Sequence, residues 1–133
     1  MVQMECLDSD IIIDFLKGRD EAVNYIKKSN EELATTSINV FEVYFGGYKI
    51  GKTKCLEDFF SSLKILTLDY NASKKAAEIG TKLSNEGRQI EVKDLLIASI
   101  CIVNGCTLVT SNIKHFSRIN ELKLKNWRNE VFY

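Results

Sequence analysis

The stretch Glu5-Cys6-Leu7-Asp8-Ser9-Asp10-Ile11-Ile12-Ile13-Asp14 decides the fold. The apolar residues before Asp8 predict a buried strand over Val2–Leu7, and the isoleucines after Asp10 predict a helix over Ile11–Lys17. Acidic side chains in a first turn suit a helix because its N-terminus carries partial positive charge. The chain therefore opens with a strand, an acidic turn and a helix in direct succession.

The rest of the chain repeats this alternation. Further strands are predicted at Leu33–Thr36, Lys64–Leu68, Thr107–Thr110 and, as an edge strand, Leu122–Leu124. Further helices are predicted at Glu21–Lys28, Lys54–Ser62, Asn71–Glu86 and Lys93–Asn104, and a helix capped by Ser37 or Asn39 is predicted to reach about Tyr48. Because alternating elements need crossover connections, we expect a three-layer α/β/α sandwich with a central, mostly parallel sheet of about four to five strands. With no proline and no Gly/Ser-rich linker, residues 1–133 are expected to form a single domain.

The composition is that of a globular protein and restricts its partners. Eighteen basic and eighteen acidic side chains give no net charge, which argues against a general nucleic-acid coat protein. The sequence shows neither a signal peptide nor an apolar run long enough for a membrane span, so we expect a cytoplasmic protein with no membrane partner. The four cysteines lack Cys-x-x-Cys spacing and there is one histidine, so no zinc site is expected.

Polar residues gather where the predicted strands end. Asp8 follows the first strand, Thr110 and Asn112 end the fourth, Glu42 lies in the helix after the second, and Asp94 opens a buried helix. Ligands of open α/β sheets bind beyond the carboxyl ends of the strands, so these side chains are expected to meet there. Neighbouring carboxylates raise one another's pKa, and a divalent cation among their oxygens stabilises them. Each acid alone could be a helix cap or a first-turn acid, and only their joint placement favours a site.

Four segments together resemble the PIN-domain family, in particular the VapC-type toxins of toxin–antitoxin pairs. They are Leu7–Asp14, Thr36–Val43, Val92–Ala98 and Leu108–Phe116, and the match spans residues 4–124. Many members carry a further acid where this chain has Asn112. An amide can bind a metal-bound water or a phosphate but adds no negative charge, which leaves open whether one or two metal ions act.

The resemblance implies a metal-dependent endoribonuclease, with Mg²⁺ or Mn²⁺ activating a water that attacks an RNA phosphodiester in line. The implied catalytic residues are Asp8, Glu42, Asp94 and Asn112, and the first three would hold the metal. Hydrogen bonds that steady this group would come from Ser9, Asp10 and Thr110.

The resemblance also implies partners. The chain would be the toxin of a type II toxin–antitoxin pair, a homodimer silenced by a VapB-like antitoxin peptide. The basic C-terminal segment supplies the candidates for contact with the RNA substrate, which are Lys114, Arg118, Lys123, Lys125 and Arg128.

The sequence leaves two alternatives open. Asn112 is compatible with a non-catalytic PIN-fold module that binds RNA or another protein. A phosphoreceiver domain has similar strand–helix alternation, and Asp69 follows the third predicted strand as its acceptor would. In that domain, however, Glu42 and Asp94 would have no role.

Overall fold

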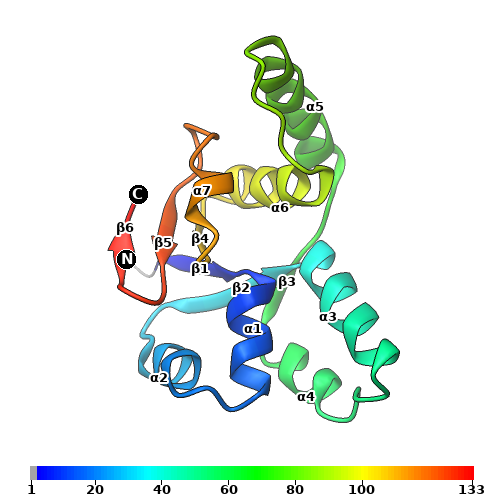
Figure 1. The fold of residues 1–133 in the computed structure, drawn as a ribbon, viewed down its shortest axis with the longest axis vertical. Coiled ribbons are helices and arrows are strands. Elements are labelled where there is room, and N and C mark those ends of the chain that lie inside the picture. Colours follow the sequence, from blue (N-terminus) through cyan, green and yellow to red (C-terminus); the bar gives the residue numbers. More distant parts are fainter. Residues whose placement is uncertain (1–2) are drawn as a thin grey trace.

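A six-stranded sheet forms the centre of the molecule in the computed structural model, which describes residues 3–133 (Figure 1). Its strands are β1 (Met4–Leu7), β2 (Glu32–Thr36), β3 (Lys64–Leu66), β4 (Thr107–Val109), β5 (Leu124–Asn126) and β6 (Val131–Phe132). Their spatial order is β3-β2-β1-β4-β5-β6, and only β6 pairs antiparallel to its neighbour. The expected mostly parallel sheet is confirmed. Val2, assigned to the first strand from sequence, lies outside the described residues.

Helices cover both faces of this sheet, as Figure 1 shows. One side carries α1 (Ser9–Leu16), α2 (Asp20–Lys28), α3 (Ser37–Lys49) and α4 (Leu56–Ser61). The other side carries α5 (Tyr70–Asn85), α6 (Val92–Val103) and α7 (Ile113–Phe116). The α/β/α layering is therefore as expected. Within the described part of the chain, no helix is long and apolar enough to cross a membrane.

Side-chain alternation along β1 and β4 divides the core in two. Cys6 and its register partner Leu108 face the cluster under α5 and α6, whereas Leu7 and its partner Val109 face the cluster under α1 and α2. Strands buried on both faces read as continuous apolar runs, which is why these stretches are so hydrophobic. Because Leu7 and Val109 end their strands side by side, the next polar residues of both strands emerge at one edge of the sheet.

Several local predictions need correction. Helix α3 is capped by Thr36, whose Oγ1 accepts from the Asn39 amide (3.1 Å), and not by Ser37 or Asn39. The last parallel strand is Leu124–Asn126, because Leu122 still lies in a turn, donating its amide to Ile119. The short elements α7 and β6 were not predicted, since neither is long enough to show a period.

Candidate active site

Asp8 is the most constrained acid at the carboxyl edge of the sheet. Its backbone amide continues the β1–β4 ladder by donating to the Val109 carbonyl (3.0 Å), which fixes the position of its Cα. Its Oδ1 accepts from the Ser9 amide (2.8 Å) and from Asn39 Nδ2 (3.0 Å), and its Oδ2 accepts from Thr110 Oγ1 (2.7 Å). Both carboxylate oxygens thus accept hydrogen bonds from donors in three separate segments, and the residue is only 8% exposed.

Asn39 links the acids to the body of the protein, and its place in the site was not foreseen. It is fully buried, its Nδ2 donates to Ser9 Oγ (2.9 Å) as well as to Asp8, and its Oδ1 accepts from Thr36 Oγ1 (2.7 Å). Ser9 Oγ in turn donates to Glu42 Oε1 (2.9 Å). The sequence signal that could have found Asn39 is a polar residue one turn before Glu42 in an otherwise apolar helix.

Asp10 fastens the loop after β4 to the start of α1. Its Oδ2 accepts from the Ser111 amide (2.7 Å) and the Ser111 hydroxyl (2.5 Å), and its Oδ1 accepts from the Ile11 amide (2.7 Å). Thr110 Oγ1, which also approaches Asp10 Oδ2 at 3.5 Å, accepts from the Asn112 amide (3.0 Å). The hydrogen-bonding role predicted for Asp10 and Thr110 therefore has a definite geometry.

Glu42 and Asp94 reach the edge from α3 and α6, and each has a basic neighbour. Lys93 Nζ lies 3.1 Å from Glu42 Oε2, an ion pair that the sequence did not predict. His115 Nδ1 lies 3.8 Å from Asp94 Oδ2 and 3.2 Å from Asn112 Nδ2, which can donate to the neutral ring. Asn112 thus sits beside the acids and contacts the one histidine.

These side chains line one open cleft of about 500 Å³. Its lining comprises Asp8, Ser9, Asp10, Glu42, Glu91, Asp94, Ser111, Asn112 and His115. All four predicted catalytic residues are therefore brought together, and Glu91 is an additional acid that was not predicted from the sequence.

The electrostatics of the cleft disfavour its own negative charge. Burial, and then the nearby charge of Asp10, raise the pKa of Asp8 to about 7 despite hydrogen bonds from Thr110, Ser9 and Asn39 that lower it. Burial, followed by Glu91, also raises the pKa of Asp94 above its ordinary value. Carboxyl groups with raised pKa values in a cleft are candidate functional groups, because active sites use burial and neighbouring like charges to shift pKa values.

Known proteins are similar to this chain in sequence and fold. The model of the PIN domain matches residues 6–122. The chain belongs to the PIN-domain family. Ribonuclease VapC2 of Rickettsia felis is 38% identical over 128 residues, covering 91% of this chain and 96% of that protein. Ribonuclease VapC2 of Haemophilus influenzae is 30% identical over 126 residues, with the same coverage of 91% and 96%. Among solved structures, VapBC2 from Rickettsia felis, bound to a DNA fragment from their promoter, matches with a TM-score of 0.86 and 32% identity over 94% of this chain and 99% of that one.

Membership of the PIN family removes the phosphoreceiver alternative, and the geometry of Asp69 agrees. Its carboxylate caps α5 by accepting from the Ala72 amide (2.9 Å). Asp69 does not line the acidic cleft of this PIN domain. Its position after β3 is therefore explained by helix capping alone.

The predicted RNA-contact residues of the PIN domain fall into two groups. Lys114 adjoins His115 in α7, and Arg118 lines a hollow that shares Glu91 and His115 with the acidic cleft. Lys123 precedes β5 and lies level with Thr107 at the amino ends of the strands, the opposite edge from the cleft.

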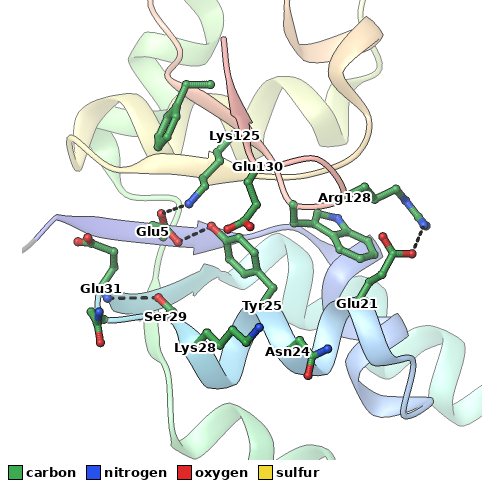
Figure 2. Close-up of a pocket in the computed structure, with 13 residues that line it drawn as sticks. Glu5, Glu21, Asn24, Tyr25, Lys28, Ser29, Glu31, Lys125, Arg128 and Glu130 are labelled. Carbon is green, nitrogen blue, oxygen red and sulfur yellow. Dashed lines mark hydrogen bonds and ion pairs between the residues drawn. The ribbon is translucent and has the colours of Figure 1, made fainter.

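Lys125 and Arg128 line a separate pocket between α2 and the β5–β6 hairpin (Figure 2), and no residue of its lining also lines the acidic cleft. Lys125 Nζ lies 3.6 Å from the buried Glu5 carboxylate, which also accepts from the Tyr25 hydroxyl (2.7 Å). Arg128 pairs with Glu21 (3.7 Å) and with Asp14 (3.5 Å). Both cations are engaged within the fold, and the structure does not place them at the cleft.

The donor set of the cleft fits a divalent cation with oxygen ligands. Asp8, Glu42 and Asp94 offer carboxylates, and Asn112 offers an amide oxygen. Among residues 3–133, no three carboxylates place oxygens within 4.8 Å of one another. As they are placed, Asp8, Glu42 and Asp94 therefore do not all contact one ion directly, and Mg²⁺ usually binds one or two carboxylates and keeps several waters.

Proposed function

We propose that this PIN domain, spanning the whole chain, is an endoribonuclease that depends on Mg²⁺ or Mn²⁺ and is the toxin of a type II toxin–antitoxin pair. The observation that carries the proposal is the single cleft lined by five acids at the carboxyl edge of a parallel sheet. Burial, and then neighbouring acids, raise the pKa of Asp8 and Asp94, so a cation that binds there would offset the cost of their buried negative charge. The relatives named ribonuclease supply the reaction class.

Each residue of the cleft has a distinct part in this proposal. A divalent cation in this cleft supplies charge neutralisation and a water acidic enough to act as nucleophile. Asp8 and Asp94 would hold it, and Glu42 would bind it or orient the water. Ser9, Asn39 and Thr110 keep the Asp8 carboxylate in one orientation through their hydrogen bonds.

Basic side chains beside the cleft would receive the RNA phosphates. We assign this part to Lys114 and Arg118, and add Lys93, which is half exposed next to Glu42. Lys123, Lys125 and Arg128 are left out of the assignment because of their positions in the fold. A phosphate contact contributes to binding of any sequence and weakens with salt.

Asp94→Asn tests the active site. It keeps the size of the side chain but removes a metal-binding charge, so we expect cleavage of a labelled single-stranded RNA in Mn²⁺ to fall by more than about 100-fold. Asp58→Asn, the same change on the exposed surface of α4, is the matched control and should cleave as the wild type does. Unchanged cleavage by the Asp94 variant would refute the assignment of Asp94 to the active site. A wild type that binds the RNA but cleaves none in either metal would favour the non-catalytic module.

An apolar groove beside the cleft supports the antitoxin part of the proposal. It measures about 550 Å³ and is lined by residues of α1, α3 and α4, among them Ile13, Leu16, Val43 and Leu56. Glu42 lines both the groove and the cleft, so a peptide helix seated in the groove would end at the acids. We therefore propose that a VapB-like peptide binds here and blocks the cleft. Leu16→Lys should abolish protection by that antitoxin without loss of cleavage.

The exposed aromatic face of α3 supports a homodimer. Phe41 and Phe45 stack on each other at 5.5 Å although they are 57% and 52% exposed, and Tyr48 is more exposed still. Exposed apolar patches of this kind mark interaction sites. We propose that a second copy covers this face, and a Phe41→Ser, Phe45→Ser variant that sediments like the wild type would refute it.

A further inference from the structure

Three cysteines that are far apart in the sequence meet in the core. Cys6 lies in β1, Cys101 lies near the end of α6, and Cys106 directly precedes β4. Their sulfur atoms all lie within 4.8 Å of one another, and the residues are 0%, 0% and 3% exposed. All three are free thiols in the described structure. They belong to the apolar cluster under α5 and α6, on the opposite face of β1 from Leu7.

The spacing of the three sulfurs suits a centre with three ligands. With metal–sulfur bonds of about 2.3 Å, three sulfurs in a trigonal arrangement lie roughly 4 Å apart. The thiols therefore need to move by less than about 1 Å to close around such a centre. No fourth His, Cys, Asp or Glu belongs to the group in residues 3–133, whereas structural zinc sites have four ligands.

Charge narrows the choice of ion further. The surrounding side chains are apolar, with Ala34, Leu108 and Ile97 in the same buried cluster. A net charge buried among such residues is costly. Three thiolates around a monovalent copper ion would leave a charge of about −2, and around a zinc ion about −1, whereas a trivalent centre leaves none.

We propose that Cys6, Cys101 and Cys106 form a binding site for trivalent arsenic, taken up as arsenous acid. Three As–O bonds break and three As–S bonds form. Each thiol proton leaves with one hydroxide as water, so three waters are released and nothing is oxidised or reduced. The product is neutral and needs no fourth ligand, which matches the apolar surroundings.

The positions of the three cysteines indicate both the route by which arsenic reaches them and the effect of its binding on the fold. Cys106 is the only one of the three residues with any exposure, and it follows the turn at Asn104 and Gly105, so we expect a ligand to enter from this side. The bound centre would join β1, α6 and the start of β4. These elements also carry or precede Asp8, Asp94 and Thr110, and Cys6 is two residues before Asp8, so the bound centre would rigidify the frame of the cleft.

Arsenite titration of the reduced, full-length protein tests the proposal. Native mass spectrometry should show one arsenic atom per chain, and the melting temperature should rise, because only the folded state holds the three thiols together and therefore binds more tightly than the unfolded chain. Cys55→Ser is the matched control, since Cys55 is exposed and outside the cluster, and it should bind as the wild type does. Cys101→Ala and Cys106→Ala should each weaken binding about 100-fold, because the third bond in the complete site forms within one molecule.

The outcomes separate a binding site from simple core packing. Two alanine variants are used because one can fail to fold; circular dichroism and the melting temperature without arsenite establish which of them is native. Absence of binding to the wild type, or equal binding by a folded alanine variant, overturns the proposal. Zinc taken up in place of arsenite, with the same dependence on Cys101 and Cys106, would overturn the argument from charge and ligand number.

Discussion

Replacement of Asp8 by Asn should stabilise the cation-free protein at alkaline pH. Burial, and then Asp10, raise the pKa of Asp8 from 3.8 to about 7 in the folded chain. At ~1.4 kcal/mol for each pH unit, that difference corresponds to about 4 kcal/mol against the ionised form. Asn has the same shape and does not ionise, so Asp8→Asn removes this cost.

The pH window follows from the direction of the shift. Below about pH 4 the carboxyl group is protonated in both states and contributes no pH dependence. Between about pH 4 and 7 the unfolded chain has lost the proton and the folded chain keeps it, so the free energy of unfolding falls as pH rises. Above about pH 7 the full cost of about 4 kcal/mol is present in the wild type and absent in the variant.

A poorer set of hydrogen bonds in the Asp8→Asn variant reduces this gain in the free energy of unfolding. In the variant, the amide oxygen can still accept from Ser9 and Asn39. The new NH₂ group, however, faces Thr110 Oγ1, which in the wild type donates to Asp8 Oδ2 at 2.7 Å. Thr110 must turn its proton toward Asp10 Oδ2 at 3.5 Å, a poorer bond that costs about 1–2 kcal/mol. We therefore expect a net stabilisation of about 2–3 kcal/mol near pH 8 and a small destabilisation near pH 4.

Urea unfolding in EDTA at about pH 5 and about pH 8 measures this. Asp58→Asn, on an exposed surface, should show no such dependence. A difference between the Asp8 variant and the wild type that is the same at both pH values would refute the reasoning. Addition of Mn²⁺ at the higher pH should stabilise the wild type alone, because the amide gives up the charge that would bind the ion.

The remaining predictions concern stability and can be checked by the same unfolding assay. Gly46→Ala should stabilise by up to about 1 kcal/mol, since its Cβ would meet nothing within 4 Å and alanine favours a helix interior. Gly47→Ala should instead destabilise by about 1–3 kcal/mol, because its Cβ would lie 2.9 Å from the Lys52 carbonyl oxygen; a stable variant would contradict this packing. Lys125→Met should cost about 2–3 kcal/mol at neutral pH by leaving the Glu5 carboxylate buried without its cation, and the double variant with Glu5→Gln should recover part of that loss.

Some of this architecture could be predicted because it rests on local patterns. The alternation of apolar runs and amphipathic helices predicted the parallel sheet, and the rule that ligands bind at the carboxyl edge brought Asp8, Glu42, Asp94 and Asn112 together before any coordinates. Asn39 could not be assigned in this way. Its two roles, in capping geometry with Thr36 and in holding Asp8, exist only once α3 packs against β1.

Predictions based on charge along the chain were less successful, for a physical reason. The basic residues after position 113 form one run in the sequence, but Lys123 precedes β5 at the amino ends of the strands, and Lys125 within β5 pairs with the buried Glu5. A strand advances about 3.3 Å per residue, so a linear run of charge is spread along the sheet and does not make one surface. The thiol cluster could not be predicted from the sequence either, because Cys6 and Cys101 meet only through the packing of α6 on the sheet.

The energetics of Asp8 bear on the simplest structural alternative, in which this residue only caps α1. Asparagine caps helices about as well as aspartate, and it would satisfy the Ser9 amide without any cost of ionisation. The folded chain instead holds an acid whose charging near neutral pH costs about 4 kcal/mol, and it surrounds that acid with donors that stabilise the charged form. A role as a helix cap alone does not account for this energetic cost. The cation binding that we propose for Asp8 does, because a carboxylate supplies a negative charge that an amide cannot.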